Sequence, residues 1–352
     1  MSLGFGIVGH GFMGHEHETM LTSMDGIQIV GICDIDADQL EDVKEGIHRY
    51  HSADELYQNP DIQVALIAAN NNQHKELVIN AAKAGKDIIC EKPVAMSVEE
   101  LDEMTKEVEK YGAKFTVHHQ RRLDKDYRIA KEIYDTGVLG DIYNIETSLY
   151  GYNGNMHDWH VFLEEGGGML YDWGVHLLDQ ILWMVNGKIA SVYADMRSVI
   201  NKEVDDYFKI FMKFENGIGA EVKLGTYYLA DREKWFERHW FLGGNKGSAY
   251  IDGFDPTGKI VRTSRLLENV GGKRTMPAAG PTRSFGTPAE GTLITEDLPT
   301  VNTCHEDYFI NYLKAYKGEE GFLVKIPETR RVLRLMDAVR ESARTGQSIA
   351  FE

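Results

Sequence analysis

The stretch Leu3-Gly4-Phe5-Gly6-Ile7-Val8-Gly9-His10-Gly11-Phe12-Met13-Gly14 joins a short apolar run to a G-x-G-x-x-G pattern. The apolar run predicts a β-strand, and the residues after it predict a helix. Glycines at these positions permit a tight turn and let backbone amides approach a pyrophosphate at the helix N-terminus. Asp34 ends the next apolar run, where a carboxylate would accept hydrogen bonds from an adenosine ribose. The pattern therefore predicts dinucleotide binding, and a glycine-rich turn without a ligand is the alternative.

Short apolar segments alternate with longer amphipathic ones through residues 3–120. The predicted strands are Leu3–Val8, Ile27–Cys33, Val64–Ala69, Asp87–Cys90 and Lys114–His118. The predicted helices include Asp36–Gly46, Gln73–Ala84 and Val98–Tyr111. This alternation favours a doubly wound parallel sheet with helices on both faces, whose sites lie beyond the carboxyl ends of the strands.

The second half of the chain shows hairpin signals instead. Tyr207–Phe214 and Ile218–Tyr228 flank Glu215-Asn216-Gly217, and Phe241-Leu242 and Ser248–Asp252 flank a glycine-rich turn. Further predicted strands are Ile142–Tyr152 and Ser191–Val199, and Asp124–Thr136 is the predicted linking helix. Residues 265–303 are rich in glycine, proline and threonine, which suggests a lid or an oligomer arm, with disorder as the alternative.

Composition narrows the class of protein. A chain of 352 residues is expected to form about two domains. Its net charge of −17 argues against nucleic acid or an anionic membrane as a partner. Three widely spaced cysteines, no signal segment and no membrane-spanning apolar run predict a cytoplasmic protein.

A second informative segment runs from Gly166-Gly167-Gly168 to Asn186-Gly187 and predicts a helix. Asp172, His176 and Asp179 fall at i, i+4 and i+7, so that they share one stripe on an otherwise apolar helix. Such a stripe is costly unless its groups are paired or face a cleft, and a merely solvated surface helix is the alternative. Asp179 is interpreted as structural, pairing within its helix or with the neighbouring domain.

The segment Glu91-Lys92-Pro93 ends a predicted buried strand and places a lysine at the carboxyl edge of the sheet. Together with the glycine loop, the Gly166–Asp179 segment and a final helix Thr329–Arg344, it makes the chain resemble the Gfo/Idh/MocA family of nicotinamide-dependent oxidoreductases. The resemblance covers nearly the whole chain. It implies an N-terminal Rossmann domain, residues 1–123, and a C-terminal α/β domain with a large, mostly antiparallel open sheet, residues 124–352. It also implies a homodimer or homotetramer.

The family's catalytic residues map onto Lys92, Asp172 and His176. His176 would act as the general acid/base, Asp172 would orient the ring or the substrate, and Lys92 would stabilise the developing alkoxide. The expected cofactor contacts are Gly9, Gly11, Phe12, Met13, Gly14, Asp34, Ile35, Asn71, His74, Glu91, Lys92 and Gln120. The usual Thr-Pro pair is replaced by Ala69-Asn70, which weakens the case for cofactor contacts in that loop. NAD is favoured over NADP because no arginine follows Asp34.

The substrate side is predicted from hydrogen-bonding groups placed beside aromatic rings, which suit a sugar or polyol. The expected contacts are Lys92, Arg121, Tyr152, His157, Trp159, Asp172 and His176. A metal site built from His157, His160, Asp172 and His176 is weighed and not favoured, because no tight ligand spacing joins the two segments.

The predicted function is hydride transfer between NAD and a secondary alcohol or ketone of a sugar, cyclitol or derivative. An NAD-dependent glycosidase that oxidises its sugar transiently is one alternative. A nucleotide-binding regulator without activity is the other.

Overall fold

The structure is a computed structural model that describes the whole chain except residues 1, 153–155, 228–232, 234, 266–273 and 283–288. Its first half contains a parallel sheet of six strands in the order β3-β2-β1-β4-β5-β6. These strands are β1 (Leu3–Val8), β2 (Ile27–Cys33), β3 (His48–Tyr50), β4 (Val64–Ile67), β5 (Asp87–Glu91) and β6 (Phe115–His118). The helices of this half are α1 (Phe12–Thr22), α2 (Ala53–Gln58), α3 (His74–Lys83) and α4 (Val98–Tyr111). The predicted Rossmann sheet is therefore confirmed.

The strand order of this sheet reverses between β1 and its neighbours β2 and β4. Open α/β sheets bind ligands at such a switch point, beyond the carboxyl ends of the strands. The central strands are buried on both faces, as the consecutive residues Ile7 and Val8 on β1 illustrate. The glycine loop that follows β1 therefore leaves the sheet at the edge where a ligand is expected.

The helix predicted over Asp36–Gly46 is wrong. This segment contains only a single 3-10 turn, Asp38–Leu40, and the unpredicted strand β3 follows it. The Asp34 carboxylate accepts a hydrogen bond from the Asp36 N–H at 2.9 Å, and the Asp36 carboxylate accepts one from the Asp38 N–H at 3.1 Å. Aspartate side chains that bond the backbone two residues ahead compete with helical hydrogen bonding, which explains the error.

The second half contains a sheet of nine strands in the order β14-β13-β12-β11-β7-β10-β9-β8-β15. Only the β7–β10 pair is parallel, so the predicted mostly antiparallel sheet is confirmed. Both predicted hairpins are present as β9–β10 and β11–β12. The strands are β7 (Ile142–Gly151), β8 (Ile189–Arg197), β9 (Tyr207–Phe214), β10 (Gly219–Gly225), β11 (Phe236–Gly244), β12 (Gly247–Asp252), β13 (Thr257–Thr263), β14 (Leu293–Asp297) and β15 (Ile349–Ala350).

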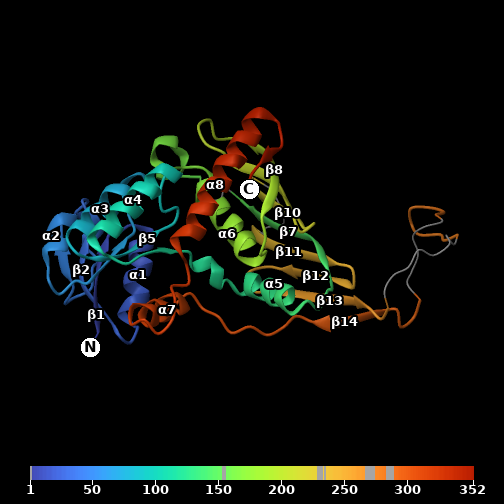
Figure 1. Cartoon of the computed structure of the whole chain (residues 1–352), viewed down its shortest axis with the longest axis horizontal. Coiled ribbons are helices and arrows are strands. Elements are labelled where there is room, and N and C mark those ends of the chain that lie inside the picture. Colours follow the sequence, from blue (N-terminus) through green and yellow to red (C-terminus); the bar gives the residue numbers. More distant parts are fainter. Residues whose placement is uncertain (1, 153–155, 228–232, 234, 266–273, 283–288) are drawn as a thin grey trace.

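Helices α5 (Lys125–Thr136), α6 (Val175–Met184) and α8 (Ile326–Thr345) pack against the large sheet, whereas α7 (Asp307–Tyr316) lies beside α1 and β1 (Figure 1). The rings of Phe309 and Tyr312 on α7 contact Phe5 on β1 edge-on. The late part of the chain thus helps to build the core of the first sheet. No helix among the described residues is long and apolar enough to cross a membrane.

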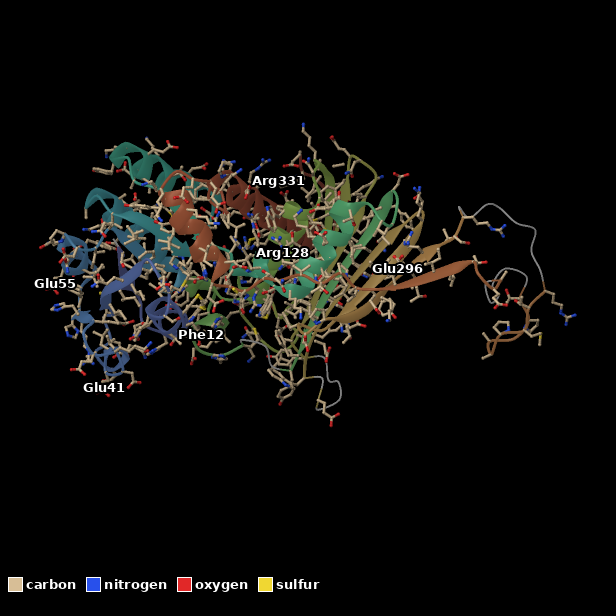
Figure 2. The ribbon with its side chains drawn as sticks, turned by 90° about the horizontal axis from the view of Figure 1, so that it is seen from below. Phe12, Glu41, Glu55, Arg128, Glu296 and Arg331 are labelled. Atoms are coloured by element: carbon tan, nitrogen blue, oxygen red, sulfur yellow. The ribbon has the colours of Figure 1, made fainter. Side chains whose placement is uncertain are left out.

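Phe12 marks the glycine loop and Glu296 marks the edge strand β14 of the large sheet, and the two are well separated in Figure 2. Strand β14 belongs to the 265–303 segment and pairs with β13. Parts of that segment lie outside the described residues, so its prediction as a lid or an arm stays a prediction.

Candidate active site

The glycine loop has the shape that a phosphate-binding turn requires. Gly9 adopts a φ of +94°, and a Cβ there would lie 2.6 Å from the Ala68 carbonyl oxygen. A Cβ on Gly14 would lie 2.2 Å from the Gly9 carbonyl oxygen, so the start of α1 can approach the loop only with glycine at this position. A Cβ on Gly11 would meet nothing within 4 Å. The open space is therefore on the ligand side of the loop, which fits a dinucleotide phosphate.

Asp34 lies directly after β2 and its carboxylate is held in place. One oxygen accepts a hydrogen bond from the His10 N–H at 2.6 Å, and the other accepts the bond from Asp36. Ile35 beside it is 93% exposed, as is Phe12 at 79%. Two large apolar side chains thus stand free at the edge where a nucleotide would lie.

A cavity of about 360 Å³ lies between this edge of the sheet and the helix that carries Asp172 and His176. Its lining includes the predicted site residues Gly11, Phe12, Met13, Asn71, Glu91, Lys92, Gln120, Arg121, His157, Trp159, Asp172 and His176. The other lining residues are Ala68, Ala69, Asn70, His160 and Trp173. Gly9, Gly14, Asp34, Ile35, His74 and Tyr152 do not line it, although the first four belong to the glycine loop and the end of β2.

Lys92 and Asp172, which both line this cavity, form an ion pair. The Lys92 Nζ lies 2.9 Å from Asp172 Oδ1 and 3.0 Å from the Asp172 carbonyl oxygen. Their side chains are only 14% and 8% exposed. Lys92 is therefore not a solvated lysine at a strand end, because its ammonium group is oriented by a residue 80 positions later in the chain.

The helix that carries the polar stripe begins irregularly. Leu170–Gly174 is a π-helical turn that leads directly into α6, so Asp172 and His176 do not follow ideal helical spacing. Such turns are rare and often occur at functional sites. Asp172, His176 and Asp179 are all buried, which excludes the solvated surface helix.

His176 is buried in the wall of the cavity. Its Nδ1 is a buried atom with no hydrogen-bond partner among the described residues. Burial holds the pKa of the His176 imidazole well below its usual range, and the Lys92 and Arg121 cations lower it further. The ring is therefore neutral at pH 7 and can accept a proton.

Asp179 takes a separate role on the same helix. Its two carboxylate oxygens accept hydrogen bonds from Arg122 at 2.7 and 2.8 Å, and both side chains are at most 2% exposed. Arg122 also pairs with Glu328 at the start of α8 at 2.8 Å. These bonds tie the segment after β6 to two helices of the second half.

Arg121 and Trp173 line one wall of the cavity together. The Arg121 guanidinium lies 3.9 Å from the centre of the Trp173 ring and 3.2 Å from Asp124. Trp173 had the spacing of a core residue, because an aromatic side chain on an apolar helix carries no sign of what covers it. Its position against Arg121 is visible only in the structure.

The Ala69-Asn70 substitution leaves the following loop well anchored. Asn71 donates a hydrogen bond to the Gly166 carbonyl oxygen at 3.0 Å. The buried ring of His74 lies 2.9 Å from the Ala69 carbonyl oxygen and 3.0 Å from that of Pro93. His74 thus connects the loop at Ala69 with the loop at Pro93 and does not itself line the cavity.

Of the predicted substrate residues after β7, His157 and Trp159 line the cavity, and Trp159 stacks on His160 at 3.7 Å. Tyr152 does not line the cavity, and its assignment as a substrate contact stays a prediction. Tyr152 is 65% exposed and outside the cavity, because its backbone continues the sheet by bonding to Trp235.

The comparisons with known proteins agree with this geometry. Residues 3–119 match the family described as an oxidoreductase family with an NAD-binding Rossmann fold, and residues 127–250 match the GFO/IDH/MocA C-terminal domain. A myo-inositol 2-dehydrogenase of Thermotoga maritima is 26% identical over 265 residues, which are 73% of this chain and 77% of the relative. A scyllo-inositol 2-dehydrogenase (NADP(+)) of Bacillus subtilis is 24% identical over 99% of this chain and 95% of its own length.

Other relatives are named as hydratases and not as dehydrogenases. A 2,7-anhydro-N-acetylneuraminate hydratase of Mediterraneibacter gnavus is 27% identical over 74% of this chain and 70% of its own length. Among solved structures, an NAD-binding protein from Listeria innocua superimposes with a TM-score of 0.92 at 32% identity over 99% of each chain. The chain belongs to the Gfo/Idh/MocA family of NAD(P)-dependent oxidoreductases.

Proposed function

We propose that this protein transfers a hydride between NAD and a secondary alcohol or ketone of a sugar, a cyclitol or a derivative of one. The observation that carries the proposal is the convergence of Lys92, Asp172 and His176 on one cavity that the glycine loop also lines. When bound, the nicotinamide would accept the hydride from the carbinol carbon.

Side chains of the protein carry out the proton transfer and stabilise the charge that develops on the substrate oxygen. His176 is neutral and its Nδ1 is buried, so Nε2 is the nitrogen that takes the hydroxyl proton. Lys92 stabilises the negative charge that develops on the substrate oxygen. Asp172 holds the Lys92 ammonium group at 2.9 Å and so fixes where this stabilisation acts. In the reduction of a ketone, the same groups act in reverse and the imidazolium returns the proton.

The choice of NAD over NADP rests on the end of β2. The Asp34 carboxylate is held by two backbone N–H groups, and Ile35 and Asp36 offer no cation for a 2′-phosphate. A fixed carboxylate favours a ribose hydroxyl and repels a phosphate at the same position. We also propose that residues 1–123 hold the cofactor and residues 124–352 hold most of the substrate.

The substrate class rests on the far wall of the cavity. Trp159 with His160 and Trp173 with Arg121 offer flat surfaces, and His157 adds a hydrogen-bonding ring. Apolar faces combined with polar tips suit a ring that carries several hydroxyl groups. The inositol dehydrogenases among the relatives support this class.

A second candidate uses the same site without net oxidation. The relatives named as hydratases favour a reaction in which the sugar is oxidised transiently and the cofactor is regenerated. A dehydrogenase would accumulate NADH, whereas such an enzyme would change its substrate without net NADH production.

The test is a screen of NAD reduction over inositols, aldoses, glycosides and sugar acids, with product analysis of each mixture. Lys92→Ala and His176→Ala should each lower turnover by about 10²–10⁴-fold, because each removes a group that acts on the reacting oxygen. Both should retain NADH binding as measured by fluorescence. The exposed residues Lys83 and His51 supply the matched controls Lys83→Ala and His51→Ala, which should behave like the wild type. Wild-type turnover in Lys92→Ala or His176→Ala would contradict the proposal.

A further inference from the structure

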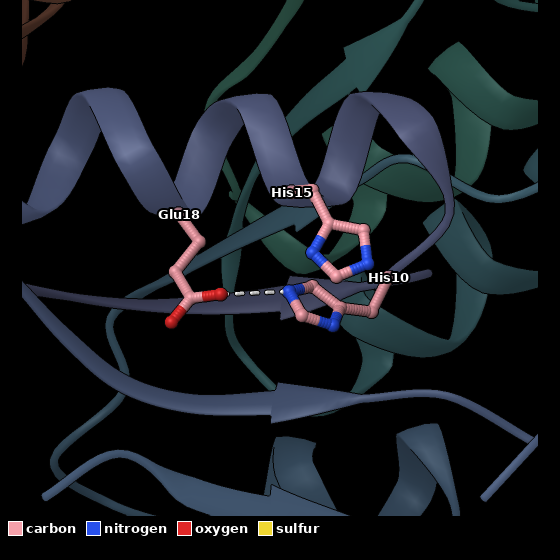
Figure 3. Close-up of side chains that lie close together, drawn as sticks. All are labelled: His10, His15 and Glu18. Carbon is pink, nitrogen blue, oxygen red and sulfur yellow. Dashed lines mark hydrogen bonds and ion pairs between the residues drawn. The ribbon is translucent and has the colours of Figure 1, made fainter. Parts of the chain in front are cut away.

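A cluster of histidine and carboxylate side chains lies behind the glycine loop, outside the groups that the proposed reaction uses. His10 lies between Gly9 and Gly11, and His15 and Glu18 lie one turn apart on α1 (Figure 3). A ring nitrogen of each histidine and a carboxylate oxygen of Glu18 all lie within 4.8 Å of one another. We propose that these three side chains form a binding site for a divalent transition-metal ion, with Zn²⁺ as the ion that best fits two imidazoles and one carboxylate.

The hydrogen bonds of His10 require a cation at this point. His10 Nδ1 lies 2.6 Å from the Gln39 carbonyl oxygen, which can only accept, so Nδ1 carries a hydrogen. In a neutral ring Nε2 is then an acceptor, yet it lies 2.9 Å from Glu18 Oε2. A carboxylate is also an acceptor, so these two atoms would repel each other without a positive charge between them. Either a proton or a metal ion must supply that charge.

The surroundings favour the metal ion over the proton. A metal-binding histidine usually donates its other ring N–H to a carbonyl group, as His10 does to Gln39. Ligand carboxylates are held by further hydrogen bonds in the same way, and Glu18 Oε1 accepts one from the Lys44 N–H at 2.8 Å. His10 and Glu18 are 0% and 4% exposed, so neither is free to turn away.

His15 supplies the third ligand. Its ring centre lies 3.9 Å from that of His10, and no hydrogen bond from its ring is found within the described part of the chain. A proton shared by His10 and Glu18 would give His15 no role, whereas a metal ion uses its free ring nitrogen. Three protein ligands leave one position of a tetrahedral zinc site for water or another small ligand.

A second cluster shows that composition alone does not define such a site. His17 and His118 each lie 2.7 Å from the same oxygen of the buried Glu91. There each neutral ring can donate its single N–H to the carboxylate, so both contacts with Glu91 form without an added cation. The other ring nitrogens, His17 Nδ1 and His118 Nε2, are buried without a hydrogen-bond partner among the described residues. Of these two clusters, only the one at His10 places a ring acceptor against a carboxylate acceptor.

Zinc binding tests the inference without any substrate and independently of the proposed function. Protein freed of metal with a chelator should bind one Zn²⁺ per chain in competition with a chromophoric chelator, and its melting temperature should rise. His15→Ala and Glu18→Gln should each weaken Zn²⁺ binding by at least about tenfold and abolish the rise. His51→Ala removes an exposed histidine elsewhere and should bind Zn²⁺ like the wild type.

X-ray absorption of the zinc-loaded wild type should show only nitrogen and oxygen neighbours, at about 2.0–2.2 Å. This measurement does not depend on how any variant folds. The inference is overturned if the wild type binds no Zn²⁺, or if His15→Ala and Glu18→Gln bind it as tightly as the wild type. It is also overturned if ¹⁵N spectra at pH 7 show His10 doubly protonated in the presence of Zn²⁺, because a proton would then fill the place of the metal.

Discussion

Replacing Asp179 by asparagine should destabilise the protein while sparing its chemistry. The substitution preserves shape but removes the charge that faces Arg122, and both side chains are at most 2% exposed. Breaking a buried ion pair by removing one partner costs about 3–5 kcal/mol. Arg122 keeps Glu328 at 2.8 Å and the Leu323 carbonyl oxygen at 2.7 Å, so we expect the lower end, about 3 kcal/mol. With about 2.1 cal/mol/K of unfolding entropy per residue over 352 residues, the melting temperature should fall by about 4 °C.

The assay is urea unfolding of Asp179→Asn, with turnover per folded molecule measured alongside. The matched control is Asp102→Asn, because Asp102 makes the same two-bond contact with Arg330, at 2.6 and 2.8 Å, but on the surface. Exposed pairs contribute less than about 1 kcal/mol, so the control should unfold nearly like the wild type. Asp172→Asn, in the turn before α6, should differ in its chemistry: turnover should be lost, together with some stability, because Asp172 pairs with the largely buried Lys92. If Asp179→Asn costs no more than Asp102→Asn, the reasoning about the buried pair is refuted.

Three further predictions concern the glycine loop, the cofactor and acid stability. Gly14→Ala should lower both the melting temperature and NADH affinity, since its Cβ would lie 2.2 Å from the Gly9 carbonyl oxygen. Gly11→Ala meets no protein atom within 4 Å and should weaken only NADH binding, so equal melting losses in the two variants would contradict this account. Asp34→Ser should shift the ratio of NADPH to NADH affinity toward NADPH by about tenfold or more, as fluorescence titration would measure. Burial lowers the pKa of His119 to about 4 from an ordinary 6.5, so the unfolded chain binds a proton that the folded chain refuses between these values. The free energy of unfolding should therefore fall as the pH drops from 6.5 toward 4, and a series of urea titrations should show a shallower fall in His119→Phe.

Much of the fold could be predicted from local pattern. The parallel sheet follows from alternating apolar runs and amphipathic helices, and the hairpin of β9 and β10 follows from the turn at Glu215-Asn216-Gly217. The segment Asp36–Gly46 could not be predicted in this way. Its aspartates form local hydrogen bonds that compete with the helix, and hydrophobic periodicity does not register such bonds.

The candidate site, like the fold, could be predicted only in part. The sequence identified the types of residue, and the cavity contains Lys92, Asp172 and His176 together as expected. It could not show that Tyr152 lies outside the cavity lining, because a position near the end of a strand does not tell whether the side chain faces a cavity or solvent.

The sequence by itself determined the class of fold, the glycine loop and the chemistry that the chain carries, because each depends on residue types at short, regular spacing. Only the tertiary structure decided which charges meet. Asp172 and Asp179 stand seven residues apart, yet one pairs with Lys92 directly after β5 and the other with Arg122 after β6. His10 Nε2 and the Glu18 carboxylate likewise come within contact only when the glycine loop folds back onto α1. Such pairings arise from contacts between segments that are distant in the chain or joined by a turn, and burial strengthens them because little water remains to screen the charges.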